Sequence, residues 1–324
     1  SRLWFLLTFL FECLYIICFS FEILYNNIMN SRKQHDETQY IELVNNVLQN
    51  GTREVSRNGT TISIFGHKME FDLNNGIVPL LTTKKIAWKT CFRELMWFIS
   101  GCTDNRKLQE KNVKIWNANA SRDFLDSRGL QHLAENDLGP VYGHQWRHFN
   151  ATYDSCNTNY DGKGVDQLQN IIIALKDTSQ HTSRRILMSS WNPCQLDEMA
   201  LPPCHVIVQF KVRESKYLSC LLYQRSGDVG LGVPFNIASY SFLCHILAHF
   251  CGLHADKLVY VLGDAHIYED HIEPLKEQIF RAPLEFPSMH FSFTPSKIEE
   301  YSEEHIIWDI PYRHYDPIQM KMSA

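Results

Sequence analysis

The chain has 324 residues, 44% of them hydrophobic and 12% aromatic, which is enough to bury a sizeable core as one large domain or two small ones. Its net charge of -5 disfavours a protein dedicated to nucleic acids or membrane surfaces, because such proteins usually carry a basic patch. The ten cysteines form no CxxC pair and no regular spacing, which favours free thiols in a reducing compartment and excludes zinc-ribbon and haem motifs. We therefore expect a cytoplasmic protein, or a nuclear one, whose partner is a small molecule.

The first 28 residues differ from the rest, because residues 3–24 are almost wholly apolar and long enough to span a bilayer. Glu12 and Glu22 lie within this run, however, and no small-residue cleavage site follows it. We expect residues 1–28 to be an extension outside the fold, Met29 to be the natural start, and residues 29–324 to form one domain. Membrane or secretory targeting by residues 1–28 is the alternative.

Hydrophobic periodicity predicts both helices and strands along this domain. Helical spacing covers residues 37–48, 88–99, 165–175 and 237–250, and strand-like segments cover residues 61–71, 186–188, 206–213 and 217–224. Glu94 is the one acid in its helix, and its apolar neighbours disfavour full exposure, although an acid on a solvated helix face is the simpler alternative. Arg184 and Arg185 stand at the edge of the short strand 186–188.

The strands at 206–213 and 217–224 flank a turn and predict a β-hairpin. Counting outward from the turn pairs Cys204 with Ser226, to within about one residue of register. Arg225 is therefore expected beside Cys204.

Cys204 follows two prolines, which stiffen its approach to the strand. A guanidinium nearby favours the thiolate, so Arg225 is expected to lower the pKa of Cys204 and make it a nucleophile. The same guanidinium can hold a phosphate bidentately. Inert packing is the alternative for a lone cysteine.

A glycine-rich loop, residues 227–232, follows the hairpin and lacks the Lys-Ser/Thr of a Walker loop. We interpret it as a loop that lets the backbone approach a flat ligand. Asn236 can both donate and accept, which suits a pyrimidine edge, although a structural helix cap is an equal alternative. His245, His249 and His254 have no carboxylate or cysteine at ligand spacing, so we predict no metal site.

Six segments together resemble the thymidylate synthase family: PLLTTK at 79–84, DLGPVYGHQWRHF at 137–149, GVDQLQ at 164–169, MALPPCH at 199–205, YQRSGDVGLGVPFNIASY at 223–240 and LGDAHIY at 262–268. The similarity runs from about Gln39 to Ala324. It implies an α+β fold with a large, mostly antiparallel sheet flanked by helices, in an obligate homodimer whose sheets pack back to back. It also implies a single catalytic domain that reductively methylates dUMP to dTMP, with 5,10-methylenetetrahydrofolate as donor of carbon and hydride.

The resemblance assigns the catalytic roles to Cys204, Glu94, Arg225, Asn236, Asp228, Tyr142 and His205. Cys204 would attack position 6 of the uracil ring and make position 5 a carbon nucleophile. Glu94 would organise proton transfers through water, and Asn236 would read the uracil edge.

The resemblance also implies the binding residues. It places dUMP against Arg57, Arg184, Arg185, Cys204, His205, Gln224, Arg225, Ser226, Gly227, Asp228, Asn236, His266, Ile267 and Tyr268. It places the folate against Ile115, Trp116, Asn119, Asp228, Leu231, Gly232, Phe235, Tyr268 and Ser323. Arg184 and Arg185 would reach across from the other subunit, and the chain end would close over the folate.

The sequence departs from the family pattern in the phosphate loop, which has one residue fewer after Arg57, so either the loop is shorter or one phosphate ligand is displaced. We expect Arg57 to be the ligand. Asn117 stands where the family has an aspartate, and Ser323-Ala324 replaces the common Ala-Val ending. These changes would tune folate affinity.

Other functions use some of the same residues. A pyrimidine hydroxymethylase would share the cysteine chemistry, but a cytosine-specific one should carry an acid in place of Asn236. A cysteine hydrolase would need a papain-type signature around Cys204, and the sequence has none. The family resemblance also implies weak RNA binding, and a catalytically silent RNA-binding protein is a third alternative.

Overall fold

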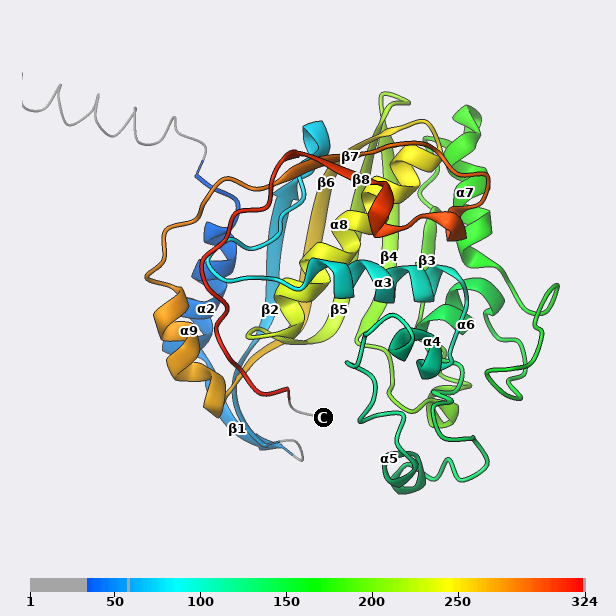
Figure 1. Ribbon diagram of the computed structural model, residues 1–324, viewed down its shortest axis with the longest axis horizontal. Helices are drawn as coiled ribbons and strands as arrows, with labels where there is room; N and C mark the ends of the chain where they lie inside the picture. Colours follow the sequence, from blue (N-terminus) through cyan, green and yellow to red (C-terminus); the bar gives the residue numbers. More distant parts are fainter. Residues whose placement is uncertain (1–33, 57–58, 323–324) are drawn as a thin grey trace, which may run out of the picture.

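The computed structural model describes residues 34–56 and 59–322, so the predicted extension at 1–28, the start at Met29, Arg57 and Ser323 lie outside the described residues. The helices are α2 (Thr38–Asn50), α3 (Trp88–Ile99), α4 (Asn105–Gln109), α5 (Arg122–Ser127), α6 (Tyr142–His148), α7 (Gln167–Lys176), α8 (Gly232–Phe250) and α9 (Ile272–Gln278) (Figure 1). The strands are β1 (Thr52–Ser56), β2 (Gly59–Asp72), β3 (Leu187–Ser189), β4 (His205–Arg213), β5 (Tyr217–Asp228), β6 (His254–Tyr268), β7 (Ser288–Phe291) and β8 (Ile306–Ile310).

The main sheet has six strands in the order β1-β2-β6-β5-β4-β3, and β7 and β8 form a separate pair. β5 and β6 are parallel, whereas their outer neighbours β4 and β2 pair antiparallel to them. The sheet is therefore mixed. The parallel pair arises because α8 connects β5 to β6, and a helical crossover returns the chain in the same direction.

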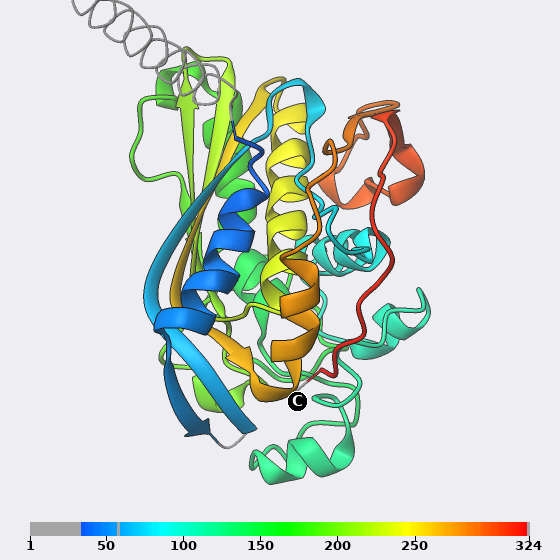
Figure 2. The same ribbon diagram turned by 90° about the vertical axis from the view of Figure 1, so that its left-hand side faces the viewer.

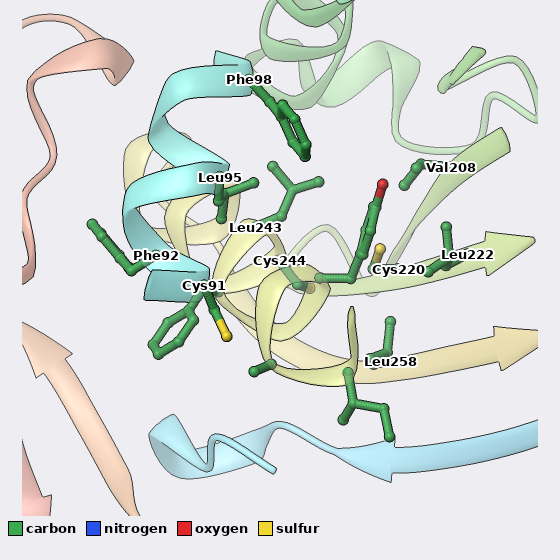
Figure 3. Close-up of a cluster of buried hydrophobic side chains, with 14 of the residues drawn as sticks. Cys91, Phe92, Leu95, Phe98, Val208, Cys220, Leu222, Leu243, Cys244 and Leu258 are labelled. Atoms are coloured by element: carbon green, nitrogen blue, oxygen red, sulfur yellow. The ribbon is translucent and has the colours of Figure 1, made fainter. Parts of the chain in front are cut away.

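The long helices α2, α3 and α8 lie on one side of the main sheet (Figure 2). α8 is buried along most of its length, which is typical of a helix that is hydrophobic on all sides. α8 packs against β5 and β6 of the sheet, and α3 packs against α8. The side chains in Figure 3 form this core and include Cys91, Phe92, Leu95 and Phe98 of α3, Leu243 and Cys244 of α8, and Val208, Cys220, Leu222 and Leu258 of the strands.

The predicted elements agree closely with the structure, except at the start of α8. The expected helix at 237–250 begins five residues earlier, at Gly232, so Asn236 lies inside the helix and is not its cap. Within residues 34–56 and 59–322, no helix is long and apolar enough to cross a membrane.

Glu37, just before α2, anchors the PLLTTK segment from within the core. Its fully buried carboxylate accepts hydrogen bonds from the backbone N–H and the hydroxyl of both Thr82 and Thr83, at 2.6 to 3.0 Å. A buried carboxylate is stable only when such donors replace its water. This anchor places the next residue, Lys84, at the glycine-rich loop, where its ammonium donates to the carbonyl of Gly230.

The sheet face opposite the long helices carries exposed apolar side chains. Leu187, Ile207 and Tyr223 are 42%, 38% and 36% exposed. Ile207 pairs with both Ser189 and Tyr223, so these positions share one face of the sheet. A row of this kind is typical of a surface that a partner covers.

Candidate active site

Cys204 and Arg225 lie opposite each other at one end of the β4–β5 hairpin. The hairpin pairs Arg213 with Tyr217, as expected, but a bulge beyond Ile207 pairs His205 with Gln224. The backbone N–H of Arg225 therefore donates to the carbonyl of Cys204, at 2.9 Å. The predicted partner Ser226 was off by one residue because a bulge adds one residue to one strand.

The two prolines before Cys204 also hold the side chain of Arg225. Its Nε donates to the carbonyl of Pro203 at 2.9 Å and its Nη2 to that of Pro202 at 3.0 Å. The guanidinium lies over the ring of Trp191, 5.5 Å from the ring centre. Trp191 was not predicted, because its place beside Arg225 depends on contacts across the fold.

Burial raises the pKa of the Cys204 thiol, and the nearby Arg225 guanidinium opposes that shift only in part. Arg225 therefore does not bring the pKa of Cys204 below its ordinary value, contrary to what was expected. The direction of the arginine effect was right, but desolvation is larger. The backbone N–H of Cys204 donates to the hydroxyl of Tyr142 at 2.8 Å, which joins the cysteine to α6.

Buried aromatic and polar side chains pack around Tyr142. Its ring stacks on Phe98 of α3 at 4.6 Å and lies 5.1 Å from the ring of His205. Burial lowers the pKa of His205 to about 4, and the neighbouring Asn236 side chain of α8 opposes this effect. His205 is therefore neutral near pH 7 and lies next to the amide that was expected to read the pyrimidine.

Glu94 is also buried, so the alternative of an acid on a solvated helix face is wrong. Its Oε1 accepts a hydrogen bond from Nε1 of Trp116 at 2.7 Å. Burial raises the pKa of Glu94 to about 7, although the Trp116 bond opposes the shift. A carboxyl group with this pKa can both donate and accept a proton near neutral pH.

The predicted nucleotide residues of β5 and β6 come together because these strands are parallel. Ser226 pairs with Asp264, Gly227 with Ala265 and Asp228 with His266. His266 Nδ1 lies 2.8 Å from Oδ1 of Asp264, and its ring is 5.3 Å from the ring of Tyr268.

Two of the predicted nucleotide residues, Gln224 and Ile267, point their side chains into the core instead. Gln224 bonds to Ser226 and Tyr260. Ile267 can therefore meet a ligand only through its backbone.

Asp228 holds the glycine-rich loop at the end of β5. Its Oδ1 accepts from the backbone N–H of Gly230 at 2.8 Å and from that of Leu231 at 3.3 Å. The same oxygen lies 3.4 Å from Nδ1 of His271, a fully buried residue that sequence reasoning missed. This loop leads directly into α8, which carries Phe235 and Asn236.

The predicted folate residues form two groups. Leu231, Gly232 and Phe235 lie at the start of α8, and Ile115, Trp116 and Asn119 lie between α4 and α5. Trp116 donates a hydrogen bond to Glu94, so the second group lies beside Glu94.

Asn117, which stands where the family has an aspartate, has a structural role. Its Oδ1 accepts hydrogen bonds from Asn105 at 3.1 Å and Gln109 at 3.0 Å.

Arg184 and Arg185 are exposed and far from Cys204 of the same chain. Leu187 pairs with Gln209, so the antiparallel register places Arg185 opposite Lys211. Lys211 is seven residues along the strand from Cys204, which is about 23 Å at the rise of a β-strand. The two arginines therefore cannot complete the Cys204 site of their own chain.

In the part of the chain that the structure describes, no group of three or more His, Cys, Asp and Glu side chains could hold a metal ion. Two of the three histidines considered above have other partners: His245 Nε2 lies 2.8 Å from the carbonyl of Ile77, and His249 Nδ1 lies 2.6 Å from the Tyr301 hydroxyl.

The fold and the site place a cysteine directly opposite an arginine at one end of the main sheet, and comparisons with known proteins name the family. The thymidylate synthase family model matches residues 38–324. The chain is 48% identical over 290 residues to the thymidylate synthase of Ascaris suum, covering 89% of this chain and 97% of that protein. It is 49% identical over 297 residues to the Homo sapiens thymidylate synthase, covering 90% and 92%. The bifunctional dihydrofolate reductase-thymidylate synthase of Leishmania amazonensis is 47% identical over 294 residues, covering 90% of this chain and 56% of that protein. The chain belongs to the thymidylate synthase family.

We predict that Glu94 makes the stability of the chain depend on pH. Its pKa of about 7 exceeds its ordinary value of 4.5, so between these pH values the folded state binds more protons than the unfolded state. The free energy of unfolding should therefore fall as pH rises through this range, by about 3 kcal/mol from this group. Glu94→Gln keeps an oxygen for Trp116 but does not titrate. Chemical denaturation from pH 4.5 to 7.5 measures the free energy of unfolding of wild type and Glu94→Gln. The difference between the two free energies should change with pH, and a difference that stays constant would contradict the effect of burial on Glu94.

Proposed function

We propose that the chain catalyses the reductive methylation of dUMP to dTMP, with 5,10-methylenetetrahydrofolate as donor of the carbon and the hydride. The observation that carries this proposal is Cys204 placed opposite Arg225 and beside the pair of His205 and Asn236. Family membership supports the reaction type, and the geometry supports the roles of the residues.

In the proposed reaction, the Cys204 sulfur bonds to position 6 of the uracil ring, and position 5 gains the electron density to attack the methylene carbon. The bond from the methylene carbon to one folate nitrogen breaks as the carbon is attacked, and the bond to the second nitrogen breaks as the proton at position 5 leaves. A hydride from the folate then completes the methyl group while the bond between the sulfur and position 6 breaks, which gives dTMP and dihydrofolate. Arg225 would turn from the two proline carbonyls to the phosphate of dUMP, since guanidinium binds phosphate more strongly than neutral oxygens.

Asn236 would set the choice of base. Its amide presents a donor and an acceptor together, which matches the edge of uracil. His205, which is neutral near pH 7, lies next to this amide. Asn236 disfavours a cytosine-specific hydroxymethylase, which would need an acid at this position.

Glu94 would serve the proton transfers through water at the pyrimidine carbonyl and the folate. Its pKa of about 7 suits a group that must donate and accept in one cycle. Tyr142 would keep the Cys204 backbone in place through its hydroxyl. His266 and Tyr268 would hold the sugar hydroxyl, and Ser226 would join Arg225 and Arg57 at the phosphate.

We further propose that the active unit is a homodimer whose main sheets pack back to back. The exposed row of Leu187, Ile207 and Tyr223 supports this arrangement, because burying it would remove apolar surface from water. The distance of Arg184 and Arg185 from their own Cys204 also supports it, since only a partner's site is left for them to complete.

The cytoplasm is the compartment we propose. Eight of the ten cysteines lie in the described residues and are free thiols, including the exposed Cys194. Free thiols persist best in a reducing compartment.

Product analysis tests the reaction. We expect wild type to convert dUMP to dTMP, to leave dCMP unchanged, and to oxidise labelled methylenetetrahydrofolate to dihydrofolate, while Cys204→Ser loses turnover by at least about 1000-fold because the oxygen is a poorer nucleophile. Hydroxymethyl-dUMP as the main product would identify a hydroxymethylase. Salt-dependent RNA affinity without any turnover would instead indicate a silent RNA-binding protein.

A mixed-subunit experiment tests the dimer. Arg184→Ala/Arg185→Ala and Cys204→Ser should each be nearly inactive alone, but hybrid dimers should regain one intact site. Random pairing of co-expressed chains gives about half hybrids and so about a quarter of wild-type activity. Activity that stays at the level of the separate variants would contradict a shared site, and Arg213→Ala, an exposed arginine at the hairpin turn, is the matched control.

A further inference from the structure

His271 contacts two segments that are distant in the sequence. It ends the short helix η4 (Glu269–His271) and is fully buried. Its Nε2 lies 2.7 Å from the carbonyl oxygen of Lys321, near the end of the described chain. A carbonyl can only accept, so Nε2 carries the proton. On the other side of the ring, Nδ1 lies 3.4 Å from Oδ1 of Asp228.

The charge of its neighbours suits a protonated imidazole. Burial lowers the pKa of His271, but contact with the Asp228 carboxylate outweighs it, and the net pKa lies above the ordinary value. Asp270 lies 3.9 Å from Nε2, and the ring of Tyr268 is 5.6 Å away. The ring therefore bonds to the chain end through Nε2, while Nδ1 faces the Asp228 carboxylate without a hydrogen bond to it.

Gly230 marks the point where these segments meet. A methyl group on Gly230 would lie 2.6 Å from Nδ1 of His271, 3.1 Å from the sulfur of Met320 and 3.2 Å from Oδ1 of Asp228. Lys84 donates to the Gly230 carbonyl, and burial lowers the pKa of Lys84 to about 8. The glycine-rich loop, the chain end and His271 therefore form one close-packed contact with no room for a side chain.

Asp228 connects this contact to the substrate residues. The oxygen that faces His271 also accepts from the N–H groups of Gly230 and Leu231, immediately before α8. Phe235 and Asn236 follow within the first turns of that helix. A shift of Asp228 would therefore move the loop on which the folate and uracil residues depend.

We propose that His271 is a positioning residue that holds the chain end through Lys321 and couples its docking to Asp228 and the start of α8. This role deepens the proposed function, because it assigns a binding contact to the segment that would close over the folate. His271 touches neither substrate, so its effect would pass through Asp228 and the chain end alone.

Limited proteolysis tests whether His271 holds the chain end, without reference to activity. Trypsin cleaves after lysine, and the Lys321 carbonyl that His271 holds belongs to the bond it would cut. We expect His271→Phe, which keeps a ring but loses both nitrogens, to lose residues 322–324 about 10-fold faster than wild type by intact mass. His271→Gln keeps a donor near the position of Nε2 and should cleave at close to the wild-type rate. Cleavage after the exposed Lys297 corrects for general loosening, and His290→Phe is the control for an exposed histidine.

Kinetics tests the coupling. His271→Phe should lower kcat about 10- to 100-fold and also weaken dUMP binding, because Asp228 holds the loop that leads to the uracil residue Asn236, with partial recovery of both in His271→Gln. Equal cleavage after Lys321 in wild type and His271→Phe would overturn the proposal, and so would faster cleavage with unchanged kcat. A wild-type protein that shows no turnover of dUMP would refute the proposed function instead, and the proteolysis would still decide whether His271 holds the chain end.

Discussion

The site depends on one backbone contact, the hydrogen bond from the N–H of Arg225 to the carbonyl of Cys204 across the β4–β5 hairpin. The bulge beyond Ile207 decides which residues meet there, because a one-residue change of register would turn the alternate side chains to the other face. From this contact the hairpin aligns Cys204 with Arg225, and β5 then leads to Asp228 and the glycine-rich loop. The parallel partner β6 brings His266 to the same end of the sheet.

Burial sets the protonation states around this contact. Desolvation raises the pKa of Cys204 and of Glu94 and lowers that of His205, so all three shifts favour the neutral form. Arg225 is the group that opposes burial at Cys204. The carbonyls of Pro202 and Pro203 hold its guanidinium on the stretch of chain that leads into Cys204.

Local patterns predicted the four longest helices, the hairpin and the approach of Arg225 to Cys204, because periodicity and turn chemistry act over short stretches of chain. They did not predict the shorter helices or the strand β6. The bulge shifted the Cys204 partner by one residue, and the start of α8 came earlier than its apolar spacing indicated, since the glycine-rich loop continues directly into the helix. Trp191 and His271 could not be predicted, because their partners are set by the fold. The resemblance to a family supplied the substrates, which spacing alone did not identify.

The central claim is that Cys204 forms a covalent bond to the uracil ring, and trapping that bond tests it most directly. With fluorine in place of the hydrogen at position 5, no proton can leave, so 5-fluoro-dUMP and methylenetetrahydrofolate should leave the enzyme joined to the nucleotide. Mass spectrometry of the denatured, digested protein should find the added mass on the peptide that contains Cys204 and none in Cys204→Ser. An adduct on another thiol such as the exposed Cys194, or turnover of dUMP without any adduct, would contradict the account.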